Sequence, residues 1–349
     1  MICDEQVLLG SCPYLYTWNG ERFEFYTDCL WSAPLGLLLA EGQVAPSRPW
    51  EYLRIDGDKL KERDGCYPLQ ITEELWEAIY LDEVRLIAVD HPADVEVYSN
   101  EKVGPAAIAR HKIHTVREPR RPVAARDQQG RDMLARIGRR DGRYVKAFNR
   151  RLAFGHTDHH YLELDFGDLE RPARITLFLT GWIRPSGTSM NVAISQNPTL
   201  QAPAAPSLWV PDADGRWREA LPYLGFPGGK TKTIAVELDD LFPAEDYRLR
   251  IATNMEIYWD EAFLTVNEAP VEVRQTPLAL VAADLHYRGF SLRTPDEEFG
   301  PEHYDYERVT IRAKWPAMRG NFTRYGDVRE LVTGSDDRLA VLGAGDELT

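Results

Sequence analysis

The segment YPLQI at residues 67–71 is followed by IYLDEVRL at residues 79–86, and this pair is the most informative part of the chain. A second copy has YRLRI at residues 247–251 and IYWDEAFL at residues 257–264. Both copies follow the pattern Y-x-L-x-I and then I-Y-x-D-E-x-x-L. Alternating apolar residues are typical of β-strands. A repeat of this size and separation indicates two related domains and not a short-period solenoid.

Further strand signals on both sides of each copy, separated by Pro/Gly turns, predict an all-β protein. The repeated phrase resembles the penultimate strands of galactose-binding-type jelly rolls, where an edge aromatic and an acidic residue precede an apolar strand. We therefore expect two jelly-roll-like β-sandwiches, at residues 5–105 and 156–270. Residues 106–155 are expected to form a mixed Arg-rich connector with a short helix at 131–137. Residues 271–349 are expected to supply a partial third β unit, truncated in mid-pattern, as in a fragment of a longer protein.

Charge is distributed unevenly along this acidic chain of 349 residues and formal net charge -14. Residues 110–151 hold fourteen Lys and Arg but four Asp and Glu. Such a segment is typical of a nucleic-acid or acidic-partner site, but Pro and Gly interrupt it and only Tyr144 and Phe148 offer rings for base stacking. We expect a connector lying over an acidic face, and no nucleic-acid partner. The longest apolar run, residues 34–40, is too short for a membrane span, and no signal peptide is visible.

Four cysteines are present, Cys3, Cys12, Cys29 and Cys66, and no C-x-x-C motif occurs. If Asn19-Gly20 is a two-residue hairpin turn, Cys12 and Cys29 become diagonal neighbours on paired strands. A bulge would bring them to disulfide distance. We therefore consider a Cys12–Cys29 disulfide, on condition that the protein is extracytoplasmic.

Two segments suggest metal ligands. His156, Asp158 and His160 would share one face of a strand, and imidazole with carboxylate suits zinc and similar metals. The acidic residues between 296 and 305 offer oxygen ligands for calcium, although the EF-hand spacing is absent. A solvated surface loop explains either segment without a metal, so calcium or zinc is possible and no cofactor is required.

Aromatic residues give the best hint of a ligand. Indole rings stack on sugar faces, and carboxylates bind sugar hydroxyls. The alternative is that these tryptophans pack in the sandwich core. The candidate ligand-binding residues are Trp209, Trp217, Tyr223, Trp259 and Asp260.

Several strings together resemble a region at the carboxyl end of bacterial FG-GAP repeat proteins (cartilage-acidic-protein-like, with ASPIC/UnbV modules) or tetratricopeptide repeat proteins. The resemblance implies an envelope-associated or secreted multidomain protein and a partner in the repeat domains of the same polypeptide. It implies no assigned activity and no catalytic residues. The strings are CPYLYTWNG at 12–20, YLDEVRL at 80–86 with VDHP at 89–92, LTGW at 179–182, GFPGGK at 225–230 and RYGDVR at 324–329.

These observations predict a non-catalytic binding or interaction module, extracytoplasmic, that binds carbohydrate or a protein partner. One alternative is a metal- or carboxylate-dependent glycan-active enzyme domain, although no pair of acids is singled out as catalytic. Another is a structural domain that docks on the repeat region.

Overall fold

The computed structural model describes residues 13–29, 38–44, 50–294, 299–312 and 316–349. The predicted all-β class is confirmed, because strands in antiparallel sheets dominate these residues. No helix in the described ranges is long and apolar enough to cross a membrane. The helices described there are α1 (Leu134–Ile137), α2 (Thr188–Ser195) and α3 (Arg329–Val332).

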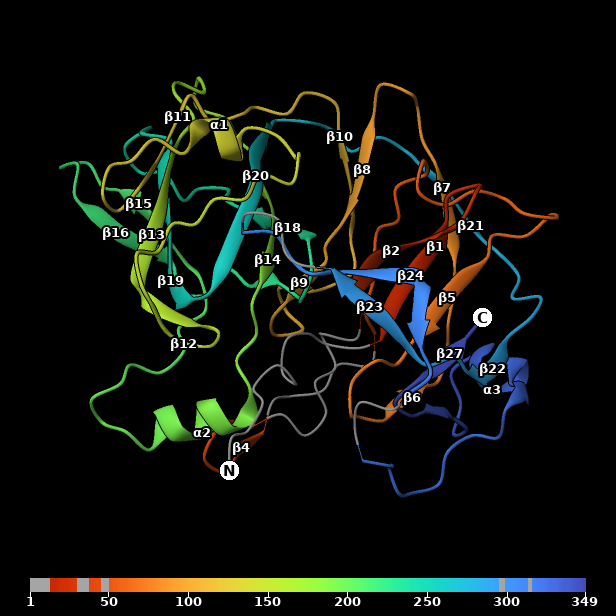
Figure 1. Ribbon diagram of the computed structural model, residues 1–349. Helices are drawn as coiled ribbons and strands as arrows, with labels where there is room; N and C mark the ends of the chain where they lie inside the picture. Colours follow the sequence, from red (N-terminus) through yellow and green to blue (C-terminus); the bar gives the residue numbers. More distant parts are fainter. Residues whose placement is uncertain (1–12, 30–37, 45–49, 295–298, 313–315) are drawn as a thin grey trace.

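Two sheets enclose the largest hydrophobic core, and together we call them the large sandwich (Figure 1). One sheet has the order β11-β13-β19-β15-β16, with β12 paired to β13, and the other has the order β18-β14-β20. The strands of the first sheet are β11 (Ala124–Asp127), β12 (Arg151–Ala153), β13 (His156–Asp165), β15 (Ser207–Pro211), β16 (Trp217–Leu221) and β19 (Arg248–Met255). Those of the second are β14 (Ile175–Ile183), β18 (Lys232–Glu237) and β20 (Ile257–Val266).

Period-two alternation sets the two faces of the first sheet. Leu162 and Leu164 of β13 point into the core and lie opposite Ile251 and Leu249 of β19. The residues between them, such as Glu163, face outward and are only partly buried. This sheet therefore has one apolar face and one solvated face, as the strand pattern predicted.

The second sheet is buried on both faces, which explains the nearly continuous apolar run of β20. Phe178 and Phe263 stack at 4.8 Å and pack with Tyr98 of strand β8 (Glu96–Ser99), which pairs with β10 (Ile113–Val116). The connector covers the edge of β20, where Val145 exchanges backbone hydrogen bonds with Trp259.

The connector is an integral part of the large sandwich. It supplies β11 and α1, and α1 confirms the helix predicted near residues 131–137. Several of its basic side chains pair with acidic groups elsewhere in the chain. The pairs are Lys112–Glu237, Arg117–Asp94, Arg121–Glu261, Arg140–Asp56 and Arg151–Glu256.

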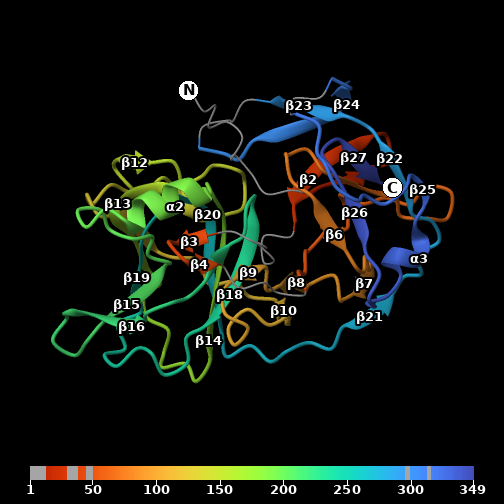
Figure 2. The same ribbon diagram turned by 90° about the horizontal axis from the view of Figure 1, so that it is seen from below.

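Both ends of the described chain build the second unit, which we call the terminal unit (Figures 1 and 2). Its main sheet has the order β2-β1-β5-β27-β22-β25, and β6 pairs with β26. The strands are β1 (Tyr14–Trp18), β2 (Phe23–Asp28), β5 (Leu69–Thr72), β6 (Ile79–Leu81), β22 (Asp284–Tyr287), β25 (Gly326–Asp327), β26 (Ala340–Leu342) and β27 (Asp346–Leu348).

The strands that we expected to begin a third unit therefore complete the sheet of the first. Leu348 of β27 lies opposite Ile71 of β5, and both belong to one core. The local sequence does not predict this pairing. The backbone hydrogen-bonding groups along the edge of β5 can pair with a strand from any part of the chain.

Further short two-stranded pairs lie outside these sheets. They are β3 (Leu38–Ala40) with β4 (Gln43–Val44), β7 (Ile87–Asp90) with β21 (Arg274–Pro277), β9 (Lys102–Val103) with β17 (Phe226–Pro227), and β23 (Phe290–Thr294) with β24 (His303–Thr310).

The repeated phrase occupies corresponding places in the two units. Its first part contributes β5 in the terminal unit and β19 in the large sandwich, each within a six-stranded sheet. Its second part contributes β6 and β20, each of which pairs in a different sheet from the first part. The relation between the two units as domains stays a prediction.

The hairpin at the amino-terminal end has a longer turn than predicted. Trp18 lies opposite Phe23 and not opposite Glu21, so four residues connect β1 to β2. The Asn19 side chain causes this, because its Oδ1 accepts hydrogen bonds from the backbone N–H groups of Glu21 (2.8 Å) and Arg22 (2.9 Å). Such an Asx turn competes with a two-residue turn.

Buried ion pairs join the two units. Asp28 of β2 lies 2.7 Å from the Nζ of Lys232 on β18. Glu302, just before β24, pairs with Lys230 and lies 3.4 Å from the Nη1 of Arg184 in the large sandwich. Oppositely charged side chains are therefore paired and buried where the two units meet.

Candidate functional site

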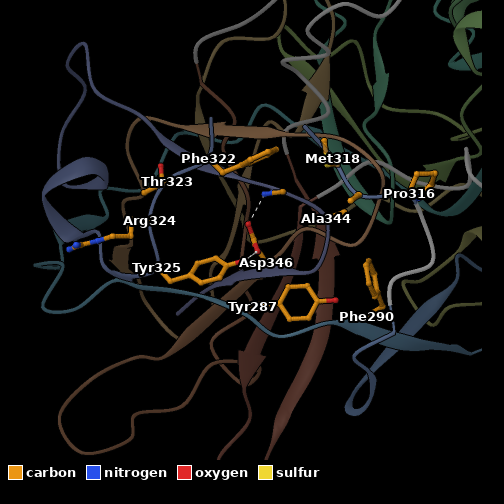
Figure 3. Close-up of a pocket in the computed structure, with 12 residues that line it drawn as sticks. Tyr287, Phe290, Pro316, Met318, Phe322, Thr323, Arg324, Tyr325, Ala344 and Asp346 are labelled. Carbon is orange, nitrogen blue, oxygen red and sulfur yellow. Dashed lines mark hydrogen bonds between the residues drawn. The ribbon is translucent and has the colours of Figure 1, made fainter. Parts of the chain in front are cut away.

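The terminal unit holds an aromatic pocket of about 490 Å³. This volume lies in the range of small-molecule sites. The lining residues, most of them labelled in Figure 3, come from β22, the start of β23, residues 316–325, the turn between β26 and β27, and the first residue of β27. The lining residues are Tyr287, Phe290, Pro316, Ala317, Met318, Phe322, Thr323, Arg324, Tyr325, Gly343, Ala344 and Asp346.

Two glycines in the β26–β27 turn let aromatic rings form the pocket walls. A Cβ on Gly343 would lie 2.9 Å from Cε1 of Phe322, and one on Gly345 would lie 2.4 Å from Cε2 of Tyr287. Gly345 also has φ +94°, a conformation that favours glycine. Each ring therefore packs directly on backbone, and a side chain at either position would collide with its ring.

Asp346 supplies the buried charge of the pocket. Its Oδ1 accepts a hydrogen bond from the Tyr325 hydroxyl (2.7 Å), and its Oδ2 accepts one from the Gly343 N–H (2.7 Å). Burial, the largest cause, raises the pKa of Asp346 above its usual range. The carboxylate is therefore held in one orientation, in a low dielectric.

Other polar groups of the lining are already engaged. The Tyr287 hydroxyl donates to the carbonyl oxygen of Ile311 at 3.0 Å. The Thr323 Oγ1 accepts from the backbone N–H of Val341 at 2.8 Å. Figure 3 shows the Arg324 side chain pointing away from the other lining groups. Besides these groups, the lining side chains offer ring surface, aliphatic surface and the Asp346 carboxylate.

Two of the predicted ligand residues come together on the outer face of the large sandwich. Trp209 lies opposite Arg250, and Arg250 lies opposite Glu163, so the three side chains share one face. The guanidinium carbon of Arg250 is 3.9 Å from the ring centroid of Trp217 and 4.1 Å from that of Tyr161. Its Nε donates to Glu163 at 2.7 Å. The result is a half-buried surface of rings and charged groups.

The other predicted ligand residues lie elsewhere. Trp259 is 1% exposed and packs in the core, as the alternative to ligand binding expected. Asp260 is also buried, and its Oδ1 accepts from the Gly142 N–H at 3.0 Å, which ties the connector to β20. Tyr223 packs beside Gly104, which follows β9.

The expected metal ligands are not assembled. On β13, His156 lies opposite Met255 and His160 opposite Thr253, so a bulge interrupts the alternation that would have aligned them with Asp158. Asp158 instead accepts from the Arg150 N–H at 3.1 Å. Across the described residues, no three His, Cys, Asp or Glu side chains form a group that could hold a metal ion. Burial lowers the pKa of His160 to about 4, so this imidazole is neutral at pH 7.

Two predictions reach beyond the described residues. Cys12 lies outside them, while the Cys29 thiol donates to the Pro13 carbonyl oxygen at 3.3 Å, so the disulfide stays a prediction. Residues 296–298 of the acidic segment considered for calcium also lie outside, and Glu302 within that segment pairs with Lys230.

Sequence reasoning missed the pocket as a site. Its clearest local signal is Gly343-Ala344-Gly345-Asp346, where small residues precede an acid at the start of a strand. Tyr325 was noticed as part of the resemblance and not as a ligand residue. The remaining walls come from segments far apart in sequence, which only the pairing of β22 with β27 brings together.

No protein-family model, curated protein or solved structure matches this chain at a significant level. The resemblance to carboxyl-terminal regions of repeat-containing bacterial proteins stays a prediction. Function is therefore argued from the pocket and from the outer face of the large sandwich.

Proposed function

We propose that the protein is a non-catalytic binding module whose principal site is the aromatic pocket of the terminal unit. The observation that carries this proposal is the combination of partly exposed rings with one oriented, buried carboxylate in a space of about 490 Å³. Convergent polar groups in a largely apolar cavity are the usual composition of a ligand site.

The lining favours binding over the glycan-active enzyme considered from sequence. Glycoside hydrolysis uses two carboxylates facing each other across the substrate, generally about 5 to 10 Å apart. Asp346 is the one carboxylate among the pocket's lining residues. Rings and a fixed charge recognise a ligand without requiring a reaction.

A pocket-filling variant tests the proposal. Ala344→Leu adds bulk to a residue that lines the space. Ligand-observed NMR against a library of small aromatic, sugar and amine compounds should detect saturable binding to the native protein. The signal should disappear in Ala344→Leu while the melting temperature stays close to native. Binding that survives in this variant would place the site elsewhere.

Carbohydrate binding on the outer face of the large sandwich is a second candidate. It is favoured by Trp209, Trp217 and Tyr161, which lie with the hydrogen-bonding groups of Glu163 and Arg250 on one face. Rings with neighbouring carboxylate and guanidinium groups suit a sugar surface. A glycan panel should show binding that Trp217→Ala abolishes and Ala344→Leu leaves unchanged. Equal binding by native protein and Trp217→Ala would refute this candidate.

Location and polypeptide context complete the proposal. We keep the periplasmic or secreted location and the docking on repeat domains as parts of it, supported by the resemblance noted from sequence. Fractionation of cells that make the native protein tests the location. Recovery in the cytoplasm would contradict it.

A further inference from the structure

Three partly exposed aromatic rings line the pocket (Figure 3). Tyr287, Phe322 and Tyr325 are 40%, 38% and 51% exposed, although each also packs against the protein. The face of an aromatic ring carries partial negative charge, so it attracts a cation held within about 6 Å of its centre. Rings on several sides of one space add their attraction.

The buried carboxylate of Asp346 also favours a cation in the pocket. Within the described part of the chain, Asp346 forms no ion pair with a lysine or arginine, and the charged group that acts on its pKa is His286, more weakly than burial does. Its two hydrogen-bond donors, the Tyr325 hydroxyl and the Gly343 N–H, are neutral. A carboxylate left without a counter-charge in a low dielectric is stabilised when a cation enters beside it.

The hydrogen bonding distinguishes among cations. A primary ammonium group has three N–H donors that need acceptors. In this pocket the Tyr287 hydroxyl donates its proton to Ile311, the Thr323 Oγ1 already accepts one hydrogen bond, and the side chains of Phe290, Met318 and Phe322 offer no strong acceptor, so most of the lining side chains match methyl groups better than N–H donors. A quaternary ammonium group has no N–H donor and presents methyl groups, which match the ring and aliphatic surface.

Taking the pocket as the ligand site proposed above, we infer that it binds a free small molecule bearing a methylated, quaternary ammonium group. The methyl groups lie against Tyr287, Phe322 and Tyr325, and the charge lies near Asp346. The trimethylammonium end of choline represents this class.

Isothermal titration with choline and with 3,3-dimethylbutan-1-ol tests the inference, because the alcohol has the same shape without the charge. Choline should bind at least tenfold more tightly than the alcohol, and ethanolamine, a primary ammonium, should bind more weakly than choline. Equal affinity for choline and its neutral analogue would overturn the cation inference.

Variants locate the binding and separate the two proposals. Asp346→Asn should reduce choline affinity at least tenfold. Phe322→Leu should do the same, and it removes a partly exposed ring without altering a buried charge. The matched control Asp284→Asn removes the same charge from an exposed carboxylate of β22 and should leave affinity unchanged. If neutral compounds bind the native protein but not Ala344→Leu, and choline does not bind, the pocket is supported as a ligand site and the preference for a cation is refuted. No binding of any compound would refute both.

A lipid headgroup carries the same trimethylammonium group, so vesicles form the last arm. Phosphatidylcholine vesicles should not co-sediment the protein. Co-sedimentation that Asp346→Asn abolishes would overturn the assignment to a free small molecule and assign the headgroup.

Discussion

Replacing Glu302 by glutamine should destabilise the junction between the two units more than any exposed charge does. The carboxylate is fully buried and pairs with Lys230, with Arg184 at 3.4 Å and with Arg293 at 3.0 Å. Glutamine has nearly the same shape, so the change removes the charge and leaves three cations, of which Lys230 is almost fully buried. Removing one partner of a buried pair typically costs about 3–5 kcal/mol.

Urea unfolding of native protein and Glu302→Gln measures this cost. Glu24→Gln is the matched control, because its pair with Arg22 is exposed and should be worth less than about 1 kcal/mol. Adding Lys230→Met to Glu302→Gln should recover part of the loss by removing a buried cation without a partner. If Glu302→Gln and Glu24→Gln cost the same, the reasoning is refuted.

The pH dependence has a definite sign. The cations around Glu302 outweigh its burial and lower its pKa, so the folded state holds the ionised form more strongly than the unfolded state. The stabilisation is present above the unfolded pKa and is lost as pH falls through the lower, folded-state pKa. Glu302→Gln should therefore flatten the fall in unfolding free energy below about pH 4.5.

Three further predictions concern the pocket, the core and β13. Gly345→Ala should cost about 1–3 kcal/mol from the strained backbone and abolish pocket binding, since its Cβ meets the Tyr287 ring, whereas Gly334→Ala, with open space around it, should leave NMR-detected binding intact. Trp259→Ala should lower the urea-unfolding free energy by about 3–5 kcal/mol, and a loss below 1 kcal/mol would contradict its place in the core. Because the pKa of buried His160 falls to about 4, the unfolded state takes up its proton first and stability declines from pH 6.5 toward 4; His160→Gln should reduce that decline by on the order of 2 kcal/mol at pH 5, and an unchanged pH profile would contradict it.

Local patterns predicted the elements whose environment is simple. The alternation around Leu162 and Leu249 marks strands with one solvated face, and the all-β class follows from many such segments. The short helix α1 was predicted from its local sequence and the glycine that ends it. The chemistry was predicted less well. Trp209 and Trp217 do share a face, but Trp259 packs in the core and a bulge separates His156 from His160.

The strand-rich class, the repeated phrase and the basic character of the connector can be read from the amino-acid sequence, because each depends on residues close together in the chain. Tertiary structure alone decided that β27 lies beside β5, since the open edge of a strand accepts a partner from any distance. That pairing places Asp346 and its glycines next to Tyr287 of β22, and it creates the pocket. A site assembled from side chains distant in sequence depends on which strand edges pair, and a local sequence pattern does not predict that pairing.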